Sequence, residues 1–248
     1  MAQSYASLRE ASGQGLTDAF AASEMTRLGT YDRVVVLSRS GTTTEVLDLL
    51  ETLSGDVPTL ALTADPTTPI VDVADASIVL DFADEQSVVQ TRFATTALAF
   101  LRAHLGQDLS GPIKDAEQAV VTAVDEAHLA AEQFSFLGRG WTVGLAQEAA
   151  LKMREAAGAW TEAYPAMEYR HGPISITGPN RIAWMLGEAP QGLSEDVAAT
   201  GGLYVAADLD PMAELIRAQL LAVALAEQRG VNPDKPRHLT RSVILQKS

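Results

Sequence analysis

The sequence contains no cysteine and few aromatic residues. Without cysteine, the chain cannot form a disulfide, a thiolate metal site or a cysteine nucleophile. Aromatic residues make up 6% of the 248 positions, so we expect a core built mainly from Ala, Val and Leu. No apolar run is long enough to span a bilayer, and the start of the chain is not typical of a signal peptide. These absences favour a cytoplasmic protein with no membrane partner.

Positive charge is also scarce, with 18 Lys and Arg against 32 Asp and Glu and a net charge of −14. Such a chain repels a phosphate backbone, so we expect no nucleic-acid partner. The charge does not exclude one small phosphorylated ligand held by a local cluster of donors. At 248 residues the chain can bury a full core, as one large domain or two smaller ones.

Short apolar runs alternate with helical patterns along the chain. The apolar runs are Val34–Leu37, Thr59–Thr63, Ile78–Phe82, Phe134–Leu137, Ile182–Leu186 and Leu203–Ala207. The helical patterns include Thr43–Leu53, Gln90–Leu105, Leu145–Ala157 and Met212–Arg229, which Gly230 closes as a left-handed cap. This alternation predicts an α/β fold of three layers, with parallel sheets flanked by helices as in flavodoxin-like and Rossmann-like proteins.

A polar, turn-rich segment at Gly106–Pro112 is the best candidate for a boundary. After it, Ile113–Gln133 is predicted to form one long helix, and the strand–turn–helix pattern then begins again. We therefore predict a duplicated α/β unit, with residues 1–112 as the first unit and 113–248 as the second. The identity between the halves is too weak to prove a duplication.

The loop after the first apolar run has the sequence SRSGTTTEV and is rich in hydroxyls. Ligands of parallel α/β sheets collect where strands end and helices begin, and a helix N-terminus favours an anion. The hydroxyl donors of this loop are Ser38, Ser40, Thr42 and Thr43; Arg39 adds charge, and Gly41 allows close backbone approach. Helix capping alone needs one such residue, so we favour an oxyanion cradle. No Gly-Lys-Ser/Thr follows, so it is not a Walker loop.

A second informative stretch is EAALKMREAAGAWTEAYPAMEYRHGPIS, which covers residues 148–175. On a helix, Glu148, Lys152 and Glu155 project from one face, because they are spaced i, i+4 and i+7. They form either a surface ladder of ion pairs or part of a reactive site. His171 precedes Gly172 and Pro173 in a segment predicted to be irregular, where its imidazole can face a cleft.

Glu and His together are the pair needed to move protons on a sugar. The residues alone leave chemistry and a solvated face equally open. No spacing among the four histidines is typical of a metal site, so we predict no metal, and we expect no cofactor.

Together with the tail GVNPDKPRHLTRSVIL, these two stretches resemble the sugar isomerase (SIS) superfamily. The likeness is strongest to the isomerase half of glutamine–fructose-6-phosphate aminotransferase and to stand-alone phosphosugar isomerases, deaminases and deglycases. The resemblance implies two tandem SIS units packed as a pseudo-dimer. It also implies a phosphorylated sugar as substrate and a homodimer whose sites are shared between subunits.

The resemblance assigns roles to individual positions of this sequence. The residues that it implies for binding of the sugar 6-phosphate are Ser38, Arg39, Ser40 and Thr43. It implies that Glu155 is the base that moves a proton between C1 and C2, with Lys152 and Glu148 as helical neighbours. His171 matches the residue that opens the sugar ring, usually from the other subunit. The strip EQSVVQTR, residues 85–92, resembles the segment beside the sugar, with Val88 and Thr91 as contacts.

The chain departs from the family pattern at two places. The first is Arg241, which stands where the aminotransferase has an imine-forming lysine. A guanidinium stays protonated and is a poor nucleophile toward a carbonyl, although it can clamp an anion or polarise an oxygen. A substrate that brings its own amine needs no such lysine, so deamination or deglycation is favoured over amination.

The second departure is at Met1, which resembles the helix after the family's first strand. We therefore expect the first sheet to lack its N-terminal strand and to have an unpaired edge.

The sequence thus predicts a phosphosugar isomerase or deaminase that acts on a hexose 6-phosphate or amino-sugar 6-phosphate by proton transfer between C1 and C2. The alternative is a sugar-phosphate-binding sensor module without turnover.

Overall fold

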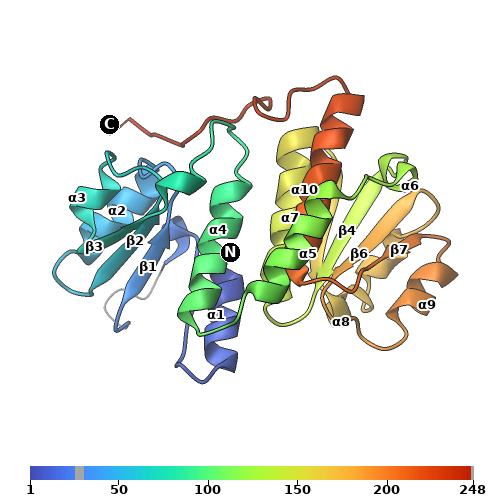
Figure 1. Cartoon of the computed structure of the whole chain (residues 1–248), viewed down its shortest axis with the longest axis horizontal. Helices are drawn as coiled ribbons and strands as arrows, with labels where there is room; N and C mark the ends of the chain where they lie inside the picture. The colour runs from blue at the N-terminus through green and yellow to red at the C-terminus, as the bar shows by residue number, and fades with distance from the viewer. Residues whose placement is uncertain (26–30, 247–248) are drawn as a thin grey trace.

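A computed structural model describes residues 1–25 and 31–246 of the chain as two parallel sheets with helices packed between and around them (Figure 1). The first sheet has the strand order β1 (Val34–Leu37), β2 (Thr59–Thr63), β3 (Ala76–Val79). The second has the order β5 (Trp160–Pro165), β4 (Gln133–Gly138), β6 (Arg181–Leu186), β7 (Leu203–Val205). Every strand pair is parallel, so the predicted α/β class is confirmed.

The helices follow the strands in the order that the sequence predicts, with several short additions. The longer ones are α1 (Ala2–Ala11), α2 (Thr44–Leu53), α4 (Arg92–His104), α5 (Ser110–Val121), α7 (Thr142–Ala157) and α10 (Pro211–Gln228). The shorter ones are α3 (Ile70–Val73), α6 (Glu126–Leu129), α8 (Ala166–Tyr169) and α9 (Leu193–Ala199), together with the 3₁₀ turns η1 (Ala22–Glu24), η2 (Asp81–Ala83) and η3 (Pro173–Ile176). None of the helices described is long and apolar enough to cross a membrane.

Helices α1, α4, α7, α5 and α10 fill the space between the two sheets (Figure 1). Helix α7 packs on α1 and α10, and α1 also packs on α4. The α1–α7 contact is close, because a Cβ at Gly144 would lie 2.4 Å from the hydroxyl of Ser4. On the other side of α7, its small residues cover Phe134, Phe136 and Trp184 of the second sheet. Small residues on α7 thus allow α4, α1 and the second sheet to come together around one helix.

One predicted helix is wrong. The sequence indicated a single helix over residues 113–133, but the chain forms α5 and then the separate helix α6. Thr122 has extended backbone geometry, and the carboxylate of Asp125 accepts a hydrogen bond of 2.8 Å from the amide of Ala127. Asp125 therefore begins a new helix, because a side chain that caps an amide favours a helix start over a helix interior.

Strand β5 was missed by the sequence prediction. It pairs along its full length with β4, with Glu162 opposite Ser135. The strand predicted at 78–82 lies earlier, at Ala76–Val79. It ends there because Leu80 leaves the strand geometry and Asp81 starts η2, where its carboxylate accepts the amide of Phe82 at 2.9 Å.

The predicted boundary at residue 112 lies in the first turn of α5, and the division into units 1–112 and 113–248 stays a prediction. Strand β1 lies at one edge of the first sheet, where no other described strand pairs with its free side, and Val35 is 38% exposed. Absence of an N-terminal strand from this sheet likewise stays a prediction. Gly230 has the predicted left-handed backbone, with φ 66°.

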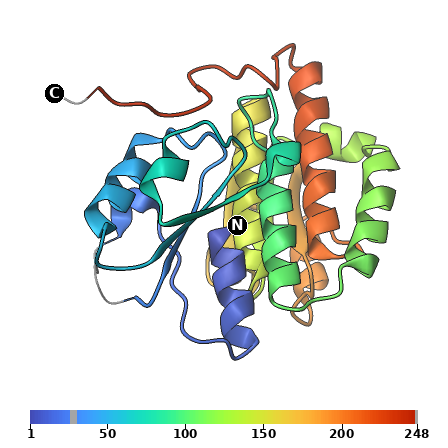
Figure 2. The same cartoon turned by 60° about the vertical axis from the view of Figure 1, so that its left-hand side comes forward.

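After α10 the chain forms a tail, residues 231–246, without helix or strand. Figures 1 and 2 show it running from the end of α10 across to the first sheet. There the amide of Thr44, in the first turn of α2, donates to the carbonyl of Val243 at 3.1 Å, and the amide of Leu245 donates to the hydroxyl of Thr44 at 2.8 Å. The end of the tail is therefore anchored to the helix that follows β1.

Candidate functional site

A cavity of about 430 Å³ lies between α4 and α7. This size lies within the usual range of small-molecule pockets. Helix α7 contributes Glu148, Lys152 and Glu155 to its wall. The opposite wall comes from Phe93 and two alanines of α4, and the loop before α4, the end of β1 and the tail complete it. One wall of the cavity is therefore charged and the other apolar.

The charged wall is a compact row of three side chains on α7. The ammonium of Lys152 lies 2.6 Å from a carboxylate oxygen of Glu155 and 3.5 Å from one of Glu148. Only 5% of the Lys152 side chain is exposed, against 12% for Glu148 and 23% for Glu155. The row is thus no solvated surface ladder: it faces a cavity, and its two carboxylates outnumber its one ammonium.

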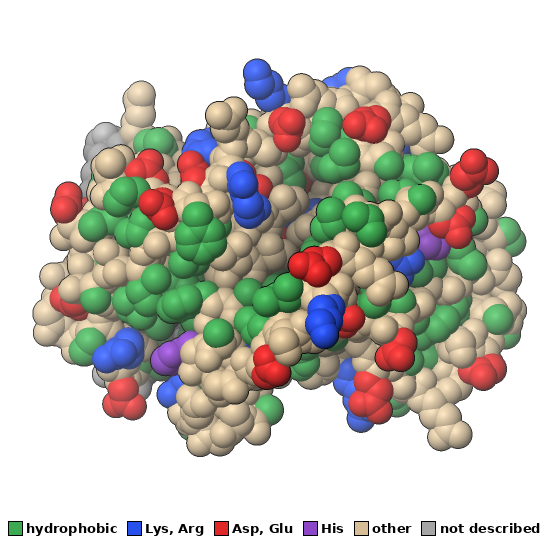
Figure 3. Space-filling view, in the orientation of Figure 1, with side chains coloured by type: hydrophobic (Ala, Val, Ile, Leu, Met, Phe, Trp, Pro, Cys, Tyr) green, Lys and Arg blue, Asp and Glu red, His purple; other side chains and the backbone are tan. Residues whose placement is uncertain are grey.

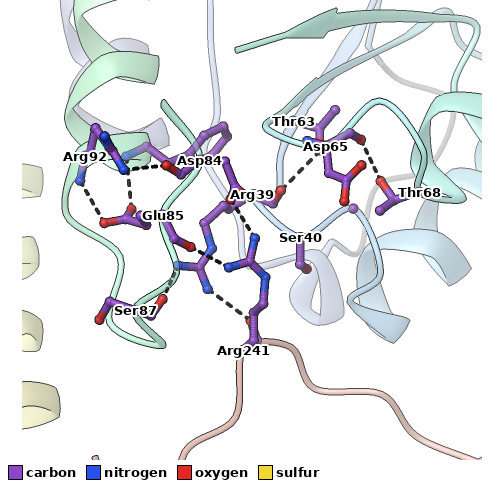
Figure 4. A network of polar contacts seen from close by, with 12 residues as sticks. Arg39, Ser40, Thr63, Asp65, Thr68, Asp84, Glu85, Ser87, Arg92 and Arg241 are labelled. Atoms are coloured by element: carbon purple, nitrogen blue, oxygen red, sulfur yellow. Dashed lines mark hydrogen bonds and ion pairs between the residues drawn. The ribbon is translucent and has the colours of Figure 1, made fainter. Parts of the chain in front are cut away.

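Arg241 reaches the cavity from the tail, far away in the sequence. Its guanidinium forms an ion pair of 2.6 Å with Asp84 and also donates to the backbone carbonyl of Glu85 (Figure 4). The position that the resemblance marks for an imine-forming lysine therefore holds a guanidinium that is oriented by the loop before α4.

The hydroxyl-rich loop follows β1, and Ser38, Arg39 and Ser40 are all buried there. Gly41 has φ 60°, and a Cβ on it would lie 2.0 Å from the Thr68 hydroxyl, so only glycine fits. Thr43 occupies the N-cap position of α2, but its side chain accepts no hydrogen bond from the helix. Simple capping therefore does not account for this threonine.

Arg39 is 1% exposed, and its guanidinium is bound by backbone carbonyls. It donates to the carbonyl of Ser87 at 2.6 Å and, at 3.4 Å, to those of Val88 and Arg241 (Figure 4). Its buried Nε has no partner, and no carboxylate of the described residues forms an ion pair with it. Burial and then the positive charge of Arg241 lower the pKa of Arg39. Two guanidiniums thus lie close together here, and only that of Arg241 has a carboxylate partner.

The tail connects this loop to the cavity. The hydroxyl of Ser242 lies 3.0 Å from that of Thr42 and 3.3 Å from that of Thr43. Its neighbours Arg241 and Val243 line the cavity, although residues 38–43 do not. The carboxylate of Glu155 is also near enough to Arg39 to act on its pKa, in the raising direction. The loop and the charged wall are therefore electrostatic neighbours.

Two of the predicted site residues lie outside this group. His171 is exposed in the turn after α8 and does not line the cavity. Thr91 also lies outside the cavity wall, because its amide and hydroxyl both donate to the carboxylate of Glu85. Val88 does line the cavity, as predicted for the strip 85–92.

Sequence reasoning missed Gln90 and Ser242. Gln90 contributes to the cavity wall from the same strip, and Ser242 contacts the hydroxyl-rich loop. Both lie in motifs that the resemblance already marked. The sequence therefore indicated the two segments but not these individual residues. In the part of the chain that the structure describes, no three His, Asp or Glu side chains are grouped to hold a metal ion.

Several known proteins are similar to this chain in sequence or in fold. No family model matches the chain. Glutamine–fructose-6-phosphate aminotransferase [isomerizing] of Xanthomonas campestris is 30% identical over 86% of this chain and 44% of its own length. The enzyme of the same name from Sulfolobus acidocaldarius is 28% identical, over 87% of this chain and 43% of its own. The chain spans less than half the length of these relatives.

Solved structures agree in fold. Glucosamine-6-phosphate deaminase from Thermotoga maritima superposes with a TM-score of 0.83 at 22% identity, over 98% of this chain and 86% of that one. Tagatose-6-phosphate ketose/aldose isomerase from Escherichia coli superposes with a TM-score of 0.77 at 17% identity, over 99% of this chain and 83% of that one. The resemblance to the sugar isomerase superfamily is confirmed. Within this fold, the charged row of α7, the hydroxyl-rich loop and the tail carry all of the predicted site residues except Val88, Thr91 and His171.

Proposed function

We propose that this protein is a phosphosugar isomerase or deaminase that acts on a hexose 6-phosphate or amino-sugar 6-phosphate. The observation that carries the proposal is the cavity itself, whose wall combines Glu155 and Lys152 of α7 with Arg241 of the tail. The relatives and structural neighbours carry names of enzymes that act on phosphorylated ketoses and amino sugars, which supports the same class.

The phosphate belongs at the loop of residues 38–43. Arg39 is buried there beside Arg241 with no carboxylate partner among the described residues, and a buried cation of this kind is stabilised by a bound anion. The hydroxyls of Ser40 and Thr43, 3.4 Å apart, are placed to donate to the same anion. With the phosphate fixed, the sugar carbons extend toward α7.

Glu155 is the base of the proposed reaction. It takes the proton from C1 or C2 of the ring-opened sugar and returns it to the other carbon, while Lys152 holds the carboxylate by its 2.6 Å contact. His171, exposed and outside the cavity, opens the ring of a substrate bound to a second subunit of a homodimer. Because Arg241 is no carbonyl nucleophile, we favour isomerisation of a sugar phosphate, or hydrolysis by water of the imine of an amino-sugar phosphate with release of ammonia or an amine, over fixation of nitrogen.

The test is a comparison of wild type with Glu155→Gln. Purified protein is incubated with fructose 6-phosphate, glucosamine 6-phosphate and a fructosamine 6-phosphate, and ammonia, amine and ketose are measured. We expect turnover of at least one substrate by wild type and a loss of about 100-fold or more in Glu155→Gln with binding retained, the usual effect of removing a general base.

Glu117→Gln is the matched control, since Glu117 is an exposed glutamate of α5. Turnover by Glu155→Gln at the wild-type rate would remove Glu155 from the mechanism. Binding of a sugar phosphate without any product would instead favour a sensor module.

A further inference from the structure

Glu85 is a buried carboxylate that lies beside two guanidiniums and forms an ion pair with neither. It is 8% exposed. Its two oxygens accept the amides of Thr91 at 3.0 Å, Arg92 at 3.2 Å and Phe93 at 3.1 Å, and the hydroxyl of Thr91 at 3.1 Å. These amides are the free donors at the start of α4. The carboxylate is therefore taken up by the helix end rather than by Arg39 or Arg241.

This contact closes the short loop of residues 85–91, because its first residue is bound to its last. The backbone of the closed loop holds both guanidiniums: the carbonyls of Ser87 and Val88 accept from Arg39, and that of Glu85 accepts from Arg241. The amide of Val88 donates at 3.0 Å to the carbonyl of Asp234 in the tail. This one loop thus holds Arg39 of the loop after β1, holds the tail and forms part of the cavity wall.

We infer that Glu85 is a positioning residue of the candidate site. Its carboxylate keeps the loop 85–91 closed, and the loop in turn sets the positions of Arg39 and Arg241 and presents Val88 and Gln90 to the cavity. The inference rests on the proposed function only for the identity of the ligand. Glu85 itself does not line the cavity, so it acts through these other residues.

The charge of Glu85 has a second consequence. A carboxylate at a helix N-terminus is stabilised by the amide donors and by the helix dipole. While α4 holds it, Glu85 forms no ion pair with Arg39, so the loop after β1 keeps its attraction for a dianion. If the contact with α4 is broken, the loop opens, the carbonyls that hold the two guanidiniums move, and the carboxylate is free to pair with them. Both changes weaken binding of a sugar phosphate, and in Glu85→Gln only the opening of the loop operates, because the amide carries no charge.

The experiment compares Glu85→Gln with Asp125→Asn. Each variant converts a helix-capping carboxylate to an amide, but Asp125 caps α6, on the far side of α10 from the site. Fructose 6-phosphate, glucosamine 6-phosphate and inorganic phosphate are titrated into each protein by calorimetry. We expect Glu85→Gln to bind the phosphates about tenfold more weakly, the scale of one charge-assisted hydrogen bond, and Asp125→Asn, whose side-chain oxygen still caps α6, to bind as wild type.

Amide hydrogen exchange supplies a measurement that needs no ligand. In Glu85→Gln, exchange of residues 86–92 and of residues 234–243 in the tail should accelerate together, while that of 126–130 stays unchanged; Asp125→Asn should keep wild-type exchange in all three segments. Wild-type exchange in both the loop and the tail of Glu85→Gln would overturn the inference, and so would unchanged phosphate affinity in a variant whose loop has opened. Glu85→Asp, which keeps the charge but shortens the reach, provides the same comparison if Glu85→Gln does not fold.

Failure of wild type to bind any of the three phosphates would refute the proposed function. The exchange data would then still decide whether Glu85 positions the loop.

Discussion

His128 is a titratable side chain that folding buries far from the candidate site. Its ring centre lies 5.2 Å from that of Trp184, whose indole N–H donates to the fully buried carboxylate of Glu214 at 2.7 Å. Arg217 pairs with the same carboxylate at 2.7 Å and lies over the Trp184 ring. Burial lowers the pKa of His128; Arg217 adds to that effect, and Asp125 and Glu214 oppose it.

Because the pKa of His128 is lower in the folded protein than its ordinary value of about 6.5, the unfolded chain takes up the proton first as the pH falls. The stabilisation is fully present above about pH 6.5 and is lost as the pH drops toward the folded pKa. We expect urea denaturation to show a larger loss of stability between pH 7.5 and 5.5 in wild type than in His128→Gln. His104→Gln, at an exposed position of α4, should keep the wild-type slope, and equal slopes in all three proteins would contradict the prediction.

At the same scale, the site residues that follow a local period were predictable and those that depend on distant contacts were not. Helical spacing alone indicates that Glu148, Lys152 and Glu155 share a face, and the structure places all three in the cavity wall. Glu85 gave no such signal, because its role depends on α4 starting seven residues later. Arg39 was predicted as a phosphate ligand, and no sequence pattern could show that backbone carbonyls surround it.

Among the elements, strands bounded by clear turns were predictable, and elements set by capping or pairing were missed. Strands β1 and β2 have the predicted bounds, since each is a short run of mainly β-branched and aliphatic residues. Strand β5 contains a glutamate and ends in proline, and its strand geometry comes from pairing with the fully buried β4. A local hydrophobic pattern does not predict that pairing. Helix propensity likewise does not predict the cap at Asp125 that separates α5 from α6.

A buried ion pair joins helix α4 to the start of helix α10. Removing it tests how much the contact between the two helices contributes to stability. The guanidinium of Arg102 donates to both oxygens of Asp210 at 2.9 and 2.8 Å, and it lies over the ring of Trp141. Asp210 also caps α10 by accepting the amide of Met212 at 2.9 Å. Side chains of the pair are 7% and 11% exposed.

We expect Asp210→Ala to lower the free energy of unfolding by about 3 kcal/mol or more, because it leaves a buried guanidinium without its carboxylate. Asp196→Ala removes the partner of Arg170 in a pair whose carboxylate is 49% exposed, and should cost about 1 kcal/mol or less. Urea denaturation of both variants measures the difference. Similar losses in the two would mean that the Arg102–Asp210 pair adds nothing beyond a surface contact.

At the scale of the whole molecule, the candidate site draws on parts of the chain that lie far apart in sequence. The loop of β1 belongs to the first sheet, α7 follows the first strand of the second, and the tail returns from α10 to join them (Figures 1 and 2). On the face shown in Figure 3, acidic side chains are scattered rather than gathered into one patch. We therefore expect the local arginine pair, rather than the net charge of −14, to govern binding of the proposed phosphate.

One predicted site residue, His171, does not line the cavity of its own chain. The proposed homodimer can therefore be tested by asking which subunit supplies this imidazole. If each cavity takes Glu155 from one subunit and His171 from the other, Glu155→Gln and His171→Ala proteins are each inactive alone. A mixed dimer carries one site with both defects and one intact site. Random exchange of subunits between the two inactive proteins should therefore restore about a quarter of wild-type turnover in a two-fold symmetric dimer.

The measurement is turnover of the substrate identified for wild type, before and after the two variants are mixed, partly unfolded in urea and refolded together. Mixing Glu155→Gln with Glu148→Gln is the control, because both changes lie on α7 of the same subunit. If His171 acts within its own chain, each cavity of the mixed dimer has one defect: one subunit lacks the Glu155 carboxylate and the other lacks the His171 imidazole. Neither site is then restored. Recovery in the first mixture alone therefore requires that the imidazole come from the second subunit, whereas a monomer in solution or no recovery would refute the shared site.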